Sequence, residues 1–76
     1  MAYSTQSRNV QRPRYRLGDA VQFLIGNQPV QGTIAEYRGP LGLGGQHLYR
    51  VEVPLYANYL QSYEVPEGEL EPVVEG

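Results

Sequence analysis

The sequence contains one histidine, His47, the residue type that most often transfers protons in enzymes. A catalytic base also needs an oriented partner beside it, and the spacing around His47 indicates none. We therefore expect His47 to be an exposed loop residue that takes no part in a reaction. The hydroxyl side chains fall in no recognised nucleophile motif: Ser4, Thr5, Ser7, Thr33 and Ser62. The sequence predicts that this protein is not an enzyme.

Carboxylates crowd one later stretch of the chain: Glu64, Glu67, Glu69 and Glu71. Two carboxylates can act as an acid and a base, but a run beside turn residues is typical of a solvated acidic edge. A transition-metal site needs more ligands than one histidine and no cysteine can supply. A calcium loop needs alternating Asp and Asn oxygens, which are missing. We expect neither a metal nor a cofactor.

A glycine-rich segment covers residues 39–45, with the sequence GPLGLGG. No Gly-Lys-Ser or Gly-Lys-Thr motif follows it and no helix is indicated, so a phosphate-binding loop is not predicted. The composition instead indicates a flexible loop between two strands. Leu41 and Leu43 are apolar in a segment expected at the surface. They either cap an open end of the fold or face a partner, and we favour capping because so small a core needs cover.

Tyrosine is abundant, with seven residues in a chain of 76. Four of them fall outside, or at the margin of, the best apolar alternation: Tyr37, Tyr56, Tyr59 and Tyr63. Tyrosine combines a large contact area and low rotamer entropy with a polar tip, which suits a binding groove. The same rings suit equally well a core that is short of apolar residues. The sequence leaves both interpretations open.

The elements that must position these residues are organised around residues 17–38, which read as two strands joined by a turn. Val21, Phe23 and Ile25 recur with a period of two, which places them on one face of a strand. Residues 26–29, with the sequence GNQP, supply turn chemistry because Gly and Asn tolerate left-handed backbone angles and Pro lacks an N–H donor.

The second strand resumes with Val30, Gly32 and Ile34 at the same period. Glycine within a strand marks a bulge or a close backbone approach, and a bulge at Gly32 would bend the strand as a small barrel requires. The core predicted for the whole chain comprises Leu17, Val21, Phe23, Val30, Ile34, Tyr49, Val51, Val53, Val65, Leu70 and Val73.

The later part of the chain indicates three more strands. Residues 48–53 alternate clearly, and Pro54 is expected to end that strand or to place it at an edge. Residues 55–61 are ambiguous between a short helix and a loop, and we predict a loop or single turn. A fourth strand is expected at residues 61–65 and a short last strand at residues 71–74.

The segments LGDAVQF (17–23) and VQGTIAEYRG (30–39) resemble the opening of SH3-like small barrels. That group includes KOW and Tudor-type modules and small SH3-like accessory subunits of photosynthetic complexes. The resemblance covers residues 16–74 as a pattern of strands and glycines. It implies an all-β, five-stranded, partly open SH3-like barrel with a 3₁₀ turn within residues 65–73. It also implies ligand binding through an aromatic groove between loops.

Charge is distributed unevenly along the chain. Residues 1–16 hold four arginines and no acid, whereas residues 17–76 hold two arginines and eight acids. Residues 1–14 are polar and are predicted to be a disordered basic arm. We favour an arm that is solvated or folded back on the acidic C-terminal segment over one docked on an acidic partner or nucleic acid. Residues 15–75 form the single domain. Without an apolar run of about 18 residues or an apolar N-terminal stretch, we expect no membrane span and a cytoplasmic location.

These observations favour a non-catalytic protein-binding module or small accessory subunit. The expected partner-binding residues are Tyr37, Leu41, Leu43, Tyr56, Tyr59 and Tyr63, and an exposed strand edge that accepts an extra strand is a further route. The alternative is a single-stranded nucleic-acid-binding module of the KOW or Tudor type. Its phosphate contacts would be Arg12, Arg14, Arg16, Arg38 and Arg50, although the acidic body disfavours it. Beside a monomer, a homodimer paired through edge strands is also open.

Overall fold

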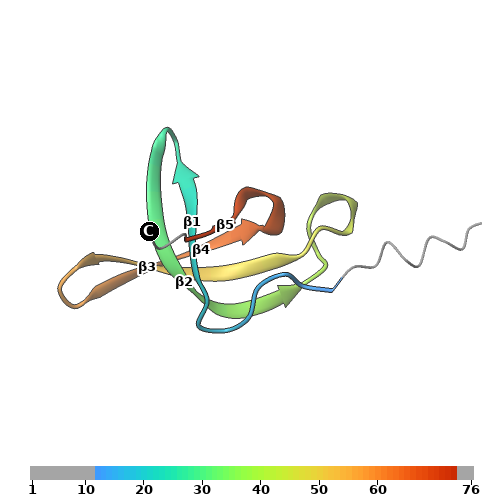
Figure 1. Cartoon of the computed structure of the whole chain (residues 1–76), viewed down its shortest axis with the longest axis horizontal. Coiled ribbons are helices and arrows are strands. Elements are labelled where there is room, and N and C mark those ends of the chain that lie inside the picture. Colours follow the sequence, from blue (N-terminus) through green and yellow to red (C-terminus); the bar gives the residue numbers. More distant parts are fainter. Residues whose placement is uncertain (1–11, 74–76) are drawn as a thin grey trace, which may run out of the picture.

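The computed structural model describes residues 12–73. The strands are β1 (Ala20–Ile25), β2 (Gln28–Gly39), β3 (Leu48–Tyr56), β4 (Tyr59–Pro66) and β5 (Glu71–Pro72), with 3₁₀ turns η1 (Leu43–Gly45) and η2 (Glu67–Glu69). All neighbouring strands are antiparallel and form one open sheet in the order β4-β3-β2-β1-β5 (Figure 1). The prediction of an all-β fold with five strands is confirmed, and so is the 3₁₀ turn that precedes the last strand.

The long strand β2 joins the two halves of the sheet. Its first part pairs with β1 and its second part with β3, and it bends strongly between them (Figure 1). The β2–β3 register shifts between Ile34 and Glu36 and again between Tyr37 and Gly39. Bulges of this kind bend a strand and increase its twist. The predicted bend is therefore present, but it lies after the glycine at position 32.

Gly32 marks a close approach of two backbones. A Cβ atom at this position would lie 2.6 Å from the carbonyl oxygen of Glu52 and 2.7 Å from Cγ1 of Val51. Only glycine leaves room for β3 at this distance, so the second of the two interpretations of Gly32 is the correct one.

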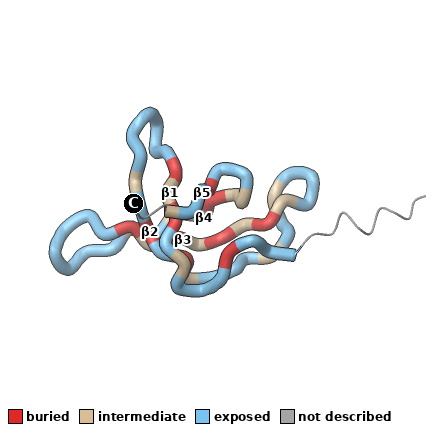
Figure 2. Tube along the Cα trace, viewed as in Figure 1, coloured by how far each residue is buried: buried red, intermediate tan, exposed pale blue. Residues whose placement is uncertain are grey.

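The core lies on the concave side of the bent sheet. Eight of the predicted core residues are buried: Val21, Phe23, Ile34, Tyr49, Val51, Val53, Val65 and Leu70. Figure 2 shows these buried positions alternating with exposed ones along the strands. Val30 is only partly buried against this cluster, and Val73 is of intermediate burial. The period-two pattern therefore predicts most of the core.

Tyr15 is a core residue that the sequence prediction missed. Its hydroxyl donates a hydrogen bond to the carbonyl oxygen of Leu70 at 3.1 Å, and its ring packs edge-on against Tyr49 at 5.6 Å. Leu17, which was predicted in the core, is 70% exposed instead. The reason is a tight turn, in which the N–H of Asp19 bonds to the carbonyl oxygen of Arg16 and leaves Leu17 outside.

The first hairpin is tighter than predicted. Only Gly26 and Asn27 form its turn, and Gln28 and Pro29 already belong to β2. Ile25, expected on the inner face, is 37% exposed because it lies at the end of the hairpin beyond the core.

The β3–β4 hairpin is longer than predicted. Pro54 does not end β3, which continues to Tyr56, and β4 begins at Tyr59. The pairing of β3 with β2 ends at Glu52, so among the described strands Pro54 pairs with β4 alone and lies at an open edge, the second of the two predicted outcomes. Pro54 lies opposite Leu60, next to a register shift that accommodates it. Of the loop or single turn expected over residues 55–61, only a two-residue turn at residues 57–58 is present, and the other five residues belong to strands. Strand pairing overrides the ambiguous local spacing.

The ends of the described chain partly match the expectations. Strand β5 contains only two residues, and Pro72 lies in an edge strand as predicted. Val74, expected in the same strand, lies outside the described residues. Most of the predicted arm over residues 1–14 also lies outside them. Within its described part, the main-chain N–H of Arg14 donates to Glu67 Oε2 at 2.9 Å.

Candidate partner-binding surfaces

The β3–β4 hairpin tip, defined here as residues 54–61, is the most apolar projection of the molecule. Its large side chains are exposed: Leu55 by 46%, Tyr56 by 75%, Tyr59 by 50% and Leu60 by 55%. The segment PLYANYLQ carries no charge. Figures 1 and 2 show the tip extending away from the body of the sheet, with its end exposed on both strands. A continuous apolar projection of this kind is typical of an interaction surface.

Local contacts give the hairpin tip a defined shape. Tyr56 and Tyr59 lie opposite each other across the two-residue turn, and their ring centroids are 6.2 Å apart. The Tyr59 hydroxyl donates to Oε1 of Gln61 at 3.1 Å. Cross-strand aromatic pairs of this kind stabilise a hairpin, so the two rings are presented together.

Tyr37 and His47 form a contact at the other end of β3. The Tyr37 hydroxyl lies 2.6 Å from Nδ1 of His47 in a hydrogen bond, and Tyr37 also packs against Tyr49 with ring centroids 5.5 Å apart. His47 lies in the loop between η1 and β3 as predicted, but it is only 9% exposed, so its predicted exposure is wrong. Tertiary packing after the glycine loop buries it. Tyr37, at 39% exposure, covers the core more than it offers a surface.

Tyr49 and Glu67 connect β3 to η2. The Tyr49 hydroxyl donates to Glu67 Oε2 at 2.6 Å and accepts a 3.3 Å hydrogen bond from the N–H of Tyr15. Burial is the main cause that raises the pKa of Tyr49 to about 12, and the hydrogen bond to Glu67 is the second cause. This arrangement holds a neutral phenol in place and is structural.

The glycine-rich loop exposes its two leucines. Leu41 is 75% exposed and Leu43 is 94% exposed, so the expectation that they cap an open end is wrong. Gly44 and Gly45 have positive φ angles, which turn the chain outward at η1. This loop precedes β3, whereas the hairpin tip follows it. The strand β3 between them has 9 residues and, at ~3.3 Å per residue step, is about 26 Å long, so the two surfaces lie at opposite ends of it.

Tyr63 is not part of either surface. It is partly buried on the core, with its ring packed edge-on against Phe23 at a centroid distance of 5.7 Å. Of the six predicted partner-binding residues, the structure therefore brings together Tyr56 and Tyr59, and separately Leu41 and Leu43. Tyr37 and Tyr63 cover the core elsewhere, and no single groove contains all six.

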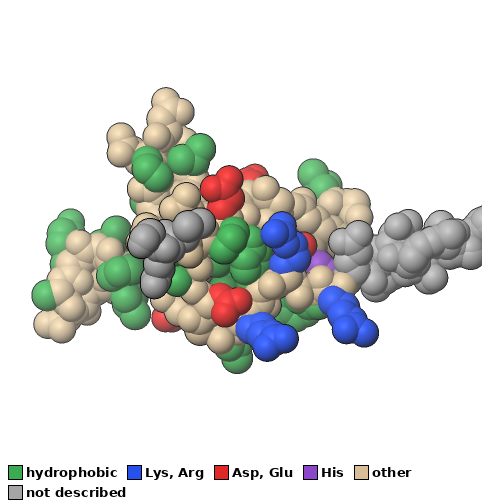
Figure 3. All heavy atoms as spheres, in the orientation of Figure 1, with side chains coloured by type: hydrophobic (Ala, Val, Ile, Leu, Met, Phe, Trp, Pro, Cys, Tyr) green, Lys and Arg blue, Asp and Glu red, His purple; other side chains and the backbone are tan. Residues whose placement is uncertain are grey.

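Two of the arginines proposed for nucleic-acid binding are paired with carboxylates. Arg38 contacts Glu36 at 3.4 Å and Glu64 at 3.3 Å, and Arg50 contacts Glu36 at 3.2 Å and Glu52 at 3.0 Å. The hydrogen bond from Arg50 is the main cause that lowers the pKa of Glu36. Figure 3 shows basic and acidic side chains interspersed on this view of the molecule.

The remaining arginines of that set lie near the start of the described chain. Arg12, Arg14 and Arg16 have exposed side chains, and the guanidinium of Arg14 lies 5.5 Å from the centre of the Tyr15 ring.

Among residues 12–73, no group of three or more His, Cys, Asp or Glu side chains is arranged to hold a metal ion. In the same range, no helix is long and apolar enough to cross a membrane.

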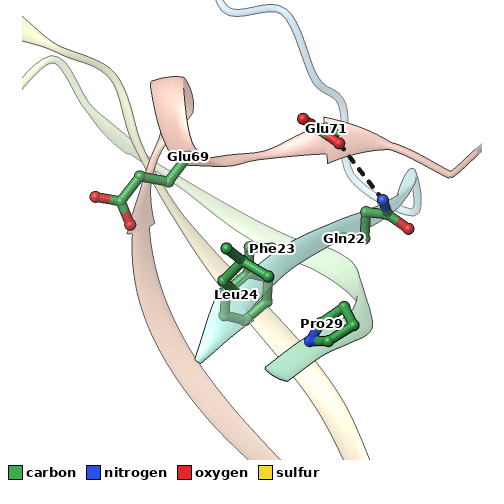
Figure 4. Close-up of a pocket in the computed structure, with 6 residues that line it drawn as sticks. All are labelled: Gln22, Phe23, Leu24, Pro29, Glu69 and Glu71. Carbon is green, nitrogen blue, oxygen red and sulfur yellow. Dashed lines mark hydrogen bonds between the residues drawn. The ribbon is translucent and has the colours of Figure 1, made fainter. Parts of the chain in front are cut away.

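One feature that the sequence did not predict is a hollow beside β1. It is lined by Gln22, Phe23, Leu24, Pro29, Glu69 and Glu71 (Figure 4). The break at Pro66-Glu67-Gly68 and the shortness of the last strand were the available signals. Together they imply that, among residues 12–73, no strand pairs with the outer side of β1 after Gln22.

Comparison of the chain with protein-family models, with curated proteins and with solved structures found no match. The functional interpretation therefore depends on the geometry of this molecule alone.

Proposed function

We propose that this chain is a non-catalytic protein-binding module or small accessory subunit that recognises a protein partner through the β3–β4 hairpin tip. The observation that carries the proposal is the exposure of Leu55, Tyr56, Tyr59 and Leu60 on an uncharged, projecting hairpin. Burying such side chains against a partner is favourable by roughly 25 cal/mol per Å² of apolar surface. The partner surface that fits is an apolar groove that can receive a hairpin end.

The architecture we propose is a partly open SH3-like barrel. Three features support it: the strongly bent β2, the 3₁₀ turn η2 between β4 and β5, and the pairing of β5 with β1. In this arrangement β1 and β2 provide the rigid base from which the β3–β4 hairpin projects.

A protein partner is favoured over single-stranded nucleic acid. Arg38 and Arg50 are engaged by Glu36, Glu52 and Glu64, so phosphate binding would have to displace existing ion pairs. The exposed tyrosines are accompanied by leucines and not by free cations. Binding that does not weaken steeply between low and moderate salt would contradict the nucleic-acid alternative.

The test uses a photo-cross-linking amino acid in place of Tyr59, expressed in the native host. We expect a discrete protein adduct that is absent when the same amino acid replaces Leu41. The captured partner is then purified, and its affinity is measured for the wild-type chain and for the triple variant Tyr56→Ser, Tyr59→Ser, Leu60→Ser.

The matched control is the double variant Leu41→Ser, Leu43→Ser, which removes equally exposed apolar side chains at the other end of β3. We expect the triple variant to bind the partner at least about a hundredfold more weakly, because three contact residues are truncated at once. The control variant should bind with wild-type affinity. Unchanged binding by the triple variant would exclude the hairpin tip as the interface.

A further inference from the structure

The hollow beside β1 has an apolar floor and an acidic side. Figure 4 shows the residues that line it: Phe23 and Leu24 on β1, Pro29 on the neighbouring strand, and Glu69 and Glu71 on the segment across from them. Its volume is about 210 Å³. Small-molecule pockets usually measure roughly 300–1,000 Å³, so this hollow has the size of one or two side chains.

The hollow exists because β5 covers only part of β1. The β1–β5 register contains Val21 opposite Pro72 and Gln22 opposite Glu71, and then ends. Had the ladder continued, Leu24 would lie opposite Glu69, but residues 67–69 form η2 and turn away. The outer edge of β1 from Phe23 onward is therefore not covered by a strand among the described residues.

The main chain of Leu24 faces this uncovered side. The carbonyl oxygen of Ala20 accepts a hydrogen bond from the N–H of Val73, so Ala20 directs its polar groups toward β5. Because successive residues of an antiparallel strand direct their N–H and C=O groups to opposite sides, Gln22 and Leu24 face the same way as Ala20. Gln22 meets β5, whereas Leu24 presents its N–H and C=O to the hollow.

The charged side chains that line the hollow are all negative. Glu69 and Glu71 are the charged residues that line it, and no arginine or histidine is among the lining residues. Glu71 Oε1 accepts a 3.4 Å hydrogen bond from Nε2 of Gln22, which leaves most of its acceptor capacity unused. Glu69 makes no ion pair within residues 12–73, so its side chain can turn toward a bound cation.

We propose that this hollow, independently of the hairpin tip, binds an extended segment of a partner protein that carries a lysine or arginine. The segment adds a short strand to β1 by pairing with the N–H and C=O of Leu24. The aliphatic stem of its basic residue packs on Leu24 and Pro29, which lie opposite each other on the exposed face, and its cationic end reaches Glu69 and Glu71. A basic side chain on an extended backbone matches all three features of the hollow.

The probe is a blocked pentapeptide, Thr-Val-Lys-Val-Thr, titrated into the ¹⁵N-labelled full chain and followed by NMR. We expect saturable shifts centred on the amide of Leu24 and the signals of residues 69–71. Replacing the lysine by norleucine should weaken binding about tenfold, because the charge-assisted contacts are lost. Methylating the lysine main-chain nitrogen should abolish binding, because that nitrogen donates to Leu24.

Protein variants separate this site from the hairpin tip. The double variant Glu69→Gln, Glu71→Gln should bind the peptide about tenfold more weakly. Glu64→Gln, which removes an exposed carboxylate on β4, and the triple hairpin-tip variant should bind it as the wild type does. Equal affinity of the norleucine or N-methylated peptide, or shifts confined to the hairpin tip, would overturn the proposal and leave the proposed function intact.

Discussion

The hydroxyl of Tyr49 donates a 2.6 Å hydrogen bond to Glu67, joining a fully buried residue of β3 to the first residue of η2. The same carboxylate oxygen accepts the main-chain N–H of Arg14. One side chain of η2 therefore holds both the strand that carries the hairpin tip and the segment that enters the domain. These two contacts tie the segment at Arg14 and the turn η2 to the strand β3 in a domain whose core is small.

The first prediction concerns alkaline pH. The pKa of Tyr49 is about 12 in the folded chain against an ordinary value of about 10, so the folded state retains the phenolic proton longer than the unfolded state. Its contribution to stability is complete below pH ~10 and is lost as the pH rises from there through about 12. The difference between an ordinary pKa of about 10 and a folded-state pKa of about 12 corresponds to about 2–3 kcal/mol of unfolding free energy. Urea denaturation at a series of pH values should show this loss.

The control for this prediction is Tyr49→Phe. That variant loses the hydrogen bond to Glu67, which lowers its stability at neutral pH by about 1–3 kcal/mol. Its stability should then fall less between pH 9 and pH 12 than that of the wild type. Parallel losses in the two proteins would show that Tyr49 is not the group responsible.

The second prediction is that Gly32→Ala strongly destabilises the sheet. The new Cβ would meet the Glu52 carbonyl oxygen at 2.6 Å, and this backbone atom cannot move without breaking β3. We expect a loss of about 2 kcal/mol or more in chemical denaturation, as in other overpacked sites. Gly68→Ala is the matched control. Its Cβ would meet only the flexible side chain of Gln46, so its cost should be smaller.

The third prediction separates binding from stability at the hairpin tip. Tyr56, Tyr59 and Leu60 are half or more exposed, so replacing all three by serine removes little buried surface. The unfolding free energy should fall by less than about 1 kcal/mol, mainly through loss of the Tyr56–Tyr59 pair. The thermal melt checks this. A loss of several kcal/mol would mean that these side chains support the fold.

The fourth prediction concerns Glu36 at acidic pH. Its pKa lies below the ordinary value, chiefly because Arg50 donates a hydrogen bond to it. The stabilising contribution is therefore present above the ordinary pKa and is lost as the pH falls through the lowered value. A ¹³C titration of the Glu36 carboxyl should show a higher pKa in Arg50→Met than in the wild type.

Arg38→Met provides the comparison for this titration. Arg38 also contacts Glu36, but its influence ranks below the Arg50 hydrogen bond, so the carboxyl pKa should rise less. A larger rise in Arg38→Met than in Arg50→Met would contradict the assigned cause.

Much of the fold could be predicted from local alternation. Val21, Phe23, Val51 and Val53 are buried as their period of two requires, because in a half-buried strand the sequence directly encodes the face. Tyr15 could not be found in this way. It is buried by partners 34 and 55 residues away in the chain, and no local pattern specifies contacts of that separation.

The candidate surfaces were predicted less completely. The abundance of tyrosine indicated Tyr56 and Tyr59 as partner-binding residues. Whether they lie in a loop or on a projecting hairpin depends on strand pairing across the Ala57-Asn58 turn, which the local sequence does not specify. The hollow beside β1 depended on where β5 stops, which is a property of the turn at η2. Burial of His47 likewise follows from its packing against Tyr37, which precedes it by ten residues.

The anchoring of Arg14 to Glu67 has a practical consequence for experiments at a solid support. Glu67 donates its N–H to the carbonyl oxygen of His47, just before β3, whereas the hairpin tip lies where β3 ends. A linker or dye attached ahead of Arg12 thus joins the domain at the end of β3 remote from Tyr56. Attachment at that end therefore leaves the exposed side chains of the hairpin tip uncovered by the label.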